Sequence, residues 1–197
     1  IVQSDIPKES QIYETFKSMV TDGQLQTEEL CKELFRYAKL YTRMVYAKSG
    51  NADLDCIFKE ISNLRMEVAY PFLLRVYADF EEKVIPQSAF EEILRMAESY
   101  VFRRRVCEIP ANSHNKTFSR LYASVRQDDY LNSVKAFFLL CEDYKEFPDD
   151  ATFRKAFVGR NIYKLSNRGC HYVLSRLQNY GTKSPVDISN LTIEHIM

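Results

Sequence analysis

Apolar residues recur every three or four positions along almost the whole chain, and this spacing constrains the fold more than any other feature. The spacing matches the 3.6 residues of one helical turn, so each apolar stripe predicts one buried face of an α-helix. The connections between stripes are short and polar, which is typical of helices that pack antiparallel to their neighbours. The sequence therefore predicts an all-α antiparallel helical bundle of about nine helices, with a short C-terminal strand.

Local signals set the expected helix ends. Pro71 suits the first turn of a helix because its missing N–H would be unpaired there anyway. Ser88 and Glu91 have the spacing of a capping box, and Asn112 or Ser113 can cap the next helix. The apolar stripes and these signals together place the nine helices at residues 12–20, 27–48, 54–61, 70–80, 88–108, 113–122, 131–141, 148–157 and 166–180.

Charge is spread unevenly along a chain whose net charge is zero. Residues 1–100 hold 12 Lys/Arg and 17 Asp/Glu, a net charge of −5, whereas residues 101–185 hold 15 and 8, a net charge of +7. The last twelve residues carry −2. A basic second half favours an anionic partner such as nucleic acid, and a basic but merely solvated surface is the alternative.

Composition favours a globular protein of the cytoplasm. With 46% hydrophobic and 27% charged residues, the chain has no apolar run of membrane-spanning length and no opening of the signal-peptide kind. Five scattered cysteines without a CxxC motif argue against a disulfide framework and against a zinc site. We expect four of the five to be small core residues on apolar helix stripes in a reducing compartment. The cysteines are Cys31, Cys56, Cys107, Cys141 and Cys170.

The last seven residues, 191–197, alternate in the manner of a strand and carry the acid–histidine pair Glu194–His195. A neutral imidazole can take a proton from water, and a neighbouring carboxylate can hold a divalent cation that neutralises charge on a leaving oxygen. An HNH-type (ββα-metal) nuclease presents its general base and metal ligand in this way. An incidental Glu–His pair on a surface strand is the alternative.

Two polar groups near the middle of the chain could contact phosphate. Three consecutive arginines end the fifth expected helix, where they either complement the negative helix terminus or bind a backbone phosphate. The polar cluster around His114 either caps the next helix or touches phosphate. The candidate nucleic-acid-binding residues are Arg103, Arg104, Arg105, Asn112, Asn115 and Lys116.

Three blocks of this chain resemble, in order, blocks of the GmrSD-like proteins, which are type IV modification-dependent restriction endonucleases and their relatives. Residues 100–121 resemble the pattern YLxRRxxCxxPxNxxNKxFxxL, residues 172–180 resemble YLLxRLExY, and residues 191–197 resemble LTIEHIMPQ. Residues 6–17 look like the segment that follows the family's N-terminal domain. The resemblance covers most of the chain.

The resemblance implies a larger bacterial protein with an N-terminal ParB-like nucleotide-hydrolysing domain, a helical middle and a C-terminal HNH-type nuclease domain. Residues 1–185 would be the helical middle domain, with a possible sub-boundary near 109–112, and residues 186–197 the truncated start of the nuclease. His195 would be the general base and Glu194 a ligand of Mg²⁺ or Mn²⁺ in the complete nuclease, whose partner would be modified phage DNA.

Two functions are therefore expected. In the first, the chain is a helical fragment of a DNA-cleaving defence protein. It links the nucleotide-hydrolysing domain to the nuclease domain and is inactive alone. The alternative is a non-catalytic helical domain that binds protein or nucleic acid.

In a longer protein that contains the complete nuclease domain, we expect His195→Ala to lower the DNA-cleavage rate by about 10²–10⁴-fold, because a general base contributes that much. Nucleotide hydrolysis should stay near the wild-type rate, and both rates can be measured on one preparation. Cleavage of modified DNA by the variant at the wild-type rate would end the assignment of His195.

Overall fold

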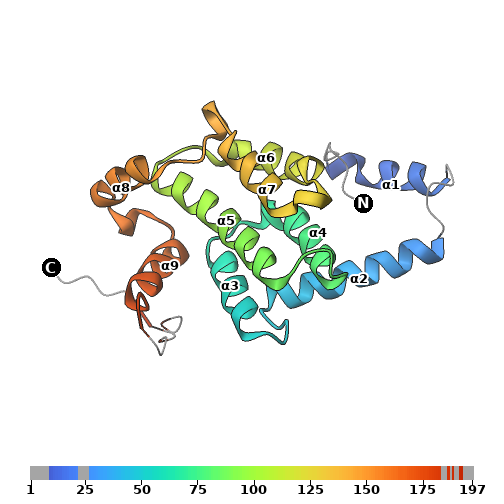
Figure 1. Ribbon diagram of the computed structural model, residues 1–197, viewed down its shortest axis with the longest axis horizontal. Coiled ribbons are helices and arrows are strands. Elements are labelled where there is room, and N and C mark those ends of the chain that lie inside the picture. Colours follow the sequence, from blue (N-terminus) through green and yellow to red (C-terminus); the bar gives the residue numbers. More distant parts are fainter. Residues whose placement is uncertain (1–8, 22–26, 183–185, 187, 189–190, 193–197) are drawn as a thin grey trace.

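The computed structural model describes residues 9–21, 27–182, 186, 188 and 191–192 of the chain (Figure 1). Within these residues it forms nine α-helices joined by short 3₁₀ turns, and it contains no strand there. The predicted all-α bundle is thereby confirmed. Most of the predicted C-terminal strand, residues 193–197, lies outside the described residues.

The helices fall within a few residues of the ranges that the apolar stripes predict. Their bounds are α1 Ile12–Thr21, α2 Thr27–Val45, α3 Ala52–Asn63, α4 Tyr70–Glu81, α5 Gln87–Val106, α6 His114–Leu121, α7 Tyr130–Leu139, α8 Asp150–Gly159 and α9 Asn167–Gln178.

Helix α5 is the axis of the bundle and runs through its middle, with α3, α4 and α7 packed around it (Figure 1). Its inward face is almost free of solvent contact because residues at helical spacing, such as Phe90, Leu94 and Val101, point to one side. Burial of each such side chain contributes about 1.5–3 kcal/mol. The position of α5 leaves its C-terminal turn, with the three arginines, between α6 and α8.

Stacked aromatic rings fix α4 against α5. The ring centroids of Tyr77 and Phe90 lie 5.2 Å apart, and those of Phe80 and Phe90 lie 5.0 Å apart with nearly parallel planes. Aromatic pairs at such distances contribute about 0.5–1.5 kcal/mol beyond the area that they bury. Tyr77 and Phe90 belong to one cluster of buried residues, against which the partly buried Phe80 packs, and helices on both sides of residues 109–112 contribute to it.

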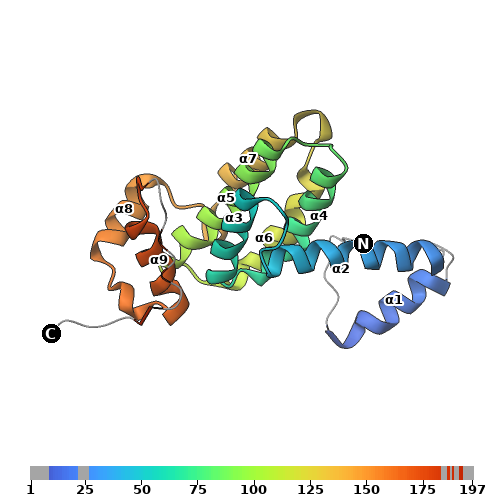
Figure 2. The ribbon, with the colours of Figure 1, turned by 90° about the horizontal axis from the view of Figure 1, so that it is seen from below.

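The two ends of the molecule differ in how they are attached. Helix α1 and the first half of α2 project from one end, and α8 and α9 form the other (Figures 1 and 2). Helix α9 packs against α3, whereas α8 lies against α5 without a single fully buried residue. Helix α8 is therefore attached by partly buried side chains alone.

Two predicted side-chain caps are wrong, although both helices begin within one residue of the predicted start. Helix α5 begins at Gln87, with extended Pro86 as its N-cap, so Ser88 lies inside the first turn and forms no capping box. Helix α6 has Ser113 as its N-cap, but no side chain there caps the helix. The Ser113 hydroxyl instead accepts a hydrogen bond from Arg104.

The cysteine prediction is also wrong for most positions. Only Cys170 is buried, while Cys31 and Cys56 are exposed and Cys107 and Cys141 are partly buried. Adjacent residues of a helix point about 100° apart, so a cysteine beside the apolar stripe faces outward.

Candidate nucleic-acid interface

The three consecutive arginines at the end of α5 reach three different parts of the structure. Successive residues of a helix point about 100° apart, so the side chains cannot share one surface. Arg103 turns toward the start of α8, Arg104 enters the interior, and Arg105 turns toward the segment after α3. The three guanidinium groups therefore differ in how accessible they are to a phosphate.

Arg103 holds the start of α8. Its Nη2 lies 2.6 Å from a carboxylate oxygen of Asp150, and its Nη1 donates to the carbonyl of Pro148 at 3.0 Å. The guanidinium also lies over the rings of Phe147 and Phe153. Because Asp150 is 88% exposed, a phosphate would have to displace a flexible surface carboxylate to reach Arg103.

Arg104 is fully buried and has no exposed N–H for a phosphate. No carboxylate pairs with it among the described residues, and its charge is instead surrounded by neutral acceptors. The position of Arg104 gives no support to the phosphate contact predicted from the sequence, because its donors are committed inside the fold. They donate to the carbonyls of Pro110, Tyr144 and Glu146, to the Ser113 hydroxyl and to Nε2 of His114, at 2.8–3.3 Å.

His114 is the nitrogen acceptor of this set. Burial, together with the nearby charges of Arg104 and Arg105, lowers its pKa from 6.5 to about 4. The imidazole is therefore neutral at neutral pH, which leaves its Nε2 free to accept the Arg104 Nε–H at 3.3 Å. The predicted polar cluster thus contains a buried acceptor rather than a helix cap.

Arg105 is a largely buried cation without a carboxylate ion pair among the described residues. Its Nη2 donates to the Leu64 carbonyl at 2.6 Å. Burial lowers the pKa of Arg105, and the neighbouring charge of Arg65 lowers it too, whereas Glu67 opposes them. Two guanidinium groups so placed repel each other, and an anion between them would relieve that repulsion.

Arg105 lines a cavity of about 570 Å³ that we call the arginine cavity, and Arg65, His114, Asn115 and Arg160 are among its other polar lining residues. These residues come from the segment after α3, the first turn of α6 and the residue after α8.

The guanidinium of Arg160, which lines this cavity, has only some of its N–H groups paired. It forms an ion pair with Glu108, while its Nε is buried without a hydrogen-bond partner in the described structure. With Glu67 and Glu108 the lining holds three positive and two negative side chains, a net charge of +1. Guanidinium groups match the geometry of phosphate oxygens, so the arginine cavity can hold one phosphate.

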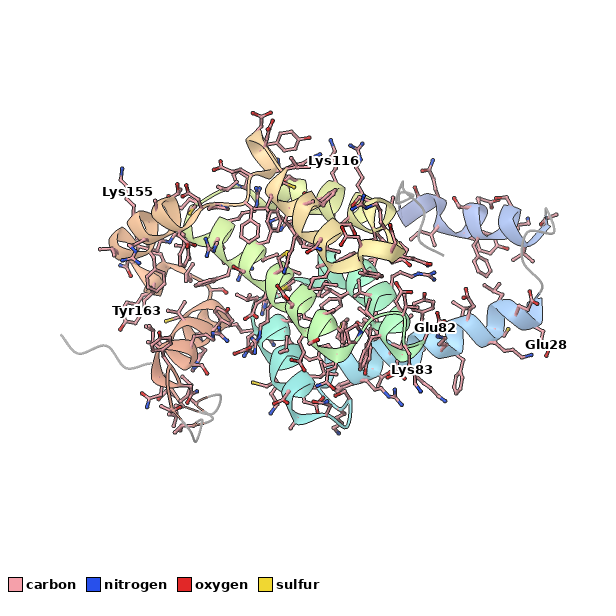
Figure 3. All side chains as sticks on the ribbon, viewed as in Figure 1. Glu28, Glu82, Lys83, Lys116, Lys155 and Tyr163 are labelled. Atoms are coloured by element: carbon pink, nitrogen blue, oxygen red, sulfur yellow. The ribbon has the colours of Figure 1, made fainter. Side chains whose placement is uncertain are left out.

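The arginine cavity is lined by some of the predicted nucleic-acid-binding residues, and others lie outside it. Arg105 and Asn115 line it together. Asn112 and Lys116 are exposed and lie outside its lining, and Figure 3 shows Lys116 on the outer side of α6. Sequence reasoning missed Arg65 and Arg160, because each is a single basic residue in a connection and belongs to no motif.

Glu194 and His195 lie outside the described residues. Among those that are described, no three His, Cys, Asp or Glu side chains come together as a metal site. None of the described helices combines the length and the hydrophobicity that a bilayer crossing requires. Comparison with family models, curated proteins and solved structures finds no match to this chain.

We expect Arg104→Met to destabilise the fold by at least about 3 kcal/mol, because several buried acceptors lose their donor and each such loss costs about 1–3 kcal/mol. Urea unfolding measures the effect. Arg126→Met is the matched control, since Arg126 is an exposed arginine whose ion pair with Asp129 contributes about 0–1 kcal/mol. Equal stability of the two variants would contradict the interior role of Arg104.

The His114 pKa predicts a specific loss of stability in acid. The unfolded chain binds a proton at His114 below pH 6.5, whereas the folded protein binds it only near pH 4. Stability contributed by neutral His114 should therefore be present above pH 6.5 and be lost between pH 6.5 and 4, by about 3 kcal/mol in total.

Urea unfolding at pH 7 and pH 4.5 checks this, with His114→Gln as the control. Glutamine also offers an acceptor to Arg104 but does not titrate, so the variant should lose less stability on acidification than the wild type. An identical loss in both proteins would show that His114 is not the titrating group.

Proposed function

We propose that this chain is the helical, DNA-contacting region of a bacterial DNA-cleaving defence protein of the GmrSD-like kind. The resemblance of three ordered sequence blocks supports the family, and the basic second half supports an anionic partner. The single observation that carries DNA contact is the arginine cavity. It holds a net positive charge and gathers predicted residues Arg105 and Asn115 in one place.

The cavity suits a backbone phosphate better than a base edge. Contacts between guanidinium groups and phosphate oxygens supply affinity and fix the position of DNA without reading its sequence. Arg105 and Arg65 would supply charge, and the unpaired Nε of Arg160 would supply a donor. In this proposal the helical region positions DNA, and discrimination of the modified base lies elsewhere.

The proposed cleavage chemistry belongs to a complete nuclease domain. There Glu194 would help to hold Mg²⁺ or Mn²⁺, a cation that supplies charge neutralisation at the leaving oxygen. His195 would accept the proton of the attacking water. The chain alone would be inactive, since half of a metal site fixes neither cation nor water. Such a protein would act in the cytoplasm, on modified phage DNA.

A second candidate function is protein binding without catalysis. It is favoured by apolar side chains that the projecting helices α1 and α2 leave exposed, among them Ile12, Tyr13, Phe16, Leu34 and Phe35. Salt-dependent DNA binding through the arginine cavity separates the first function from the second.

We expect Arg105→Gln to weaken binding of a 20-base-pair duplex about tenfold at 100 mM salt, because a charge-assisted contact to one phosphate is lost. The slope of log affinity against log salt should become shallower by about 1. Fluorescence anisotropy of labelled DNA, titrated at several salt concentrations, measures both quantities.

Lys32→Gln is the matched control, because it removes one positive charge from a side chain that is 72% exposed on α2. It should change neither affinity nor slope appreciably. If both variants bind DNA as the wild type does, or if the wild type does not bind at all, the arginine cavity is not a DNA contact.

A further inference from the structure

A second cavity, of about 450 Å³, opens between α5, α8 and α9. Four aromatic rings line it, namely Phe102 of α5, Phe153 and Phe157 of α8, and Tyr172 of α9, and we call it the aromatic cavity. Small-molecule sites in proteins have volumes of this order and are lined mainly by apolar and aromatic side chains with a few polar groups.

The rings of the aromatic cavity are arranged around Phe102. Its centroid lies 4.9 Å from that of Tyr172 and 5.7 Å from that of Phe153, with planes inclined by about 60° in both pairs. Phe153 and Phe157 lie 5.5 Å apart at 34°. Rings from three different helices therefore line one space.

The three arginines that line this cavity are all balanced by carboxylates, of which only Glu98 belongs to the lining itself. Each arginine already has a carboxylate partner, so none of them is an unpaired cation. Arg95 and Arg176 pair with Glu60, Arg95 also pairs with Glu98, and Arg103 pairs with Asp150.

Hydrogen-bond donors exceed acceptors around the rim of this cavity. Each carboxylate oxygen of Glu98 already accepts one hydrogen bond, one from the Tyr172 hydroxyl at 2.7 Å and the other from Arg95 at 2.9 Å. Guanidinium N–H groups and the Ser99 hydroxyl remain as donors to a ligand. The cavity therefore suits a flat, uncharged ring with acceptor atoms on its edge.

From this chemistry we propose that the aromatic cavity binds an unstacked nucleobase. Every base offers a planar face for aromatic stacking, and ring nitrogens and carbonyl oxygens supply acceptors at its edge. This base site is separate from the proposed backbone contact. It rests on the proposed function in one respect only, namely that the base comes from DNA.

Both cavities are lined in part by α5, and the residue after α8 reaches the arginine cavity, which favours nucleic acid over another ligand with a flat ring. Arg103 and Arg105 lie two residues apart on α5, one at each cavity. Phe157 and Arg160 lie three residues apart near the end of α8. Phe157 lines the aromatic cavity and Arg160 lines the arginine cavity. Proteins that hold single strands combine positive charge for the backbone with aromatic rings for the bases, and the two cavities offer these two features on opposite sides of α5.

The first test uses free nucleosides, so it is independent of DNA binding. Saturation-transfer NMR with adenosine and cytidine on the full chain should show transfer to base protons, while ribose alone should show none. Phe157→Leu should weaken nucleoside binding about fivefold or more, the low end for loss of one stacking contact. Phe35→Leu is the matched control, since Phe35 is 63% exposed on α2.

The second test compares single-stranded dodecamers with and without one abasic site. Phe157→Leu should reduce the preference for the intact strand, whereas Arg105→Gln should weaken both strands equally. If Arg105→Gln weakens binding and Phe157→Leu changes neither nucleosides nor the abasic preference, the base site is refuted and the backbone contact stands. If nucleosides bind through Phe157 while Arg105→Gln has no effect on DNA, the base site stands and the proposed backbone contact fails.

One further outcome would overturn the inference. Binding of an amphipathic, leucine-rich peptide that requires Phe157, with no saturation transfer to either nucleoside, would make the aromatic cavity a protein-docking groove. Equal urea stability of Phe157→Leu and the wild type is the check that the substitution acts on the cavity and not on the fold.

Discussion

The buried guanidinium of Arg104 is the interaction on which the second half of the structure depends. Moving an unpaired charge out of water is costly, and here the cost is offset by dipoles instead of by an opposite charge. The carbonyls of Pro110, Tyr144 and Glu146 all accept from it, so one side chain ties two connections to the end of α5. The loops around α6 and before α8 take their shape from that side chain.

This arrangement also decides what the neighbouring arginines can do. Because Arg104 is directed inward, the helical twist sends Arg103 and Arg105 to opposite sides of α5. Arg103 then fixes α8, and Arg105 is left in the arginine cavity beside another guanidinium. Three consecutive arginines thus take three different positions: Arg104 in the interior, Arg103 against the start of α8, and Arg105 in the lining of the arginine cavity.

The sequence predicts the architecture well because periodicity is a local property. The stripe through Phe90, Leu94 and Val101 identifies α5 and its buried face without any tertiary information. The site is different, since burial of Arg104 depends on carbonyls about 40 residues away in the chain. The convergence of Arg65 and Arg160 with Arg105 depends likewise on how α3 and α8 pack, which no motif encodes. Glu194 and His195 lie outside the described residues, so the predicted catalytic pair stays a prediction.

The weak attachment of α8 has a consequence for motion. A helix without a fully buried residue contributes little to global stability, so its detachment from α5 has a much smaller free-energy cost than unfolding of the bundle. The aromatic cavity is closed on one side by this helix alone, through Phe153 and Phe157. Amide hydrogens of α8 would then exchange with solvent long before those of α5. A ligand could enter the aromatic cavity by a local opening of α8 that leaves the core intact.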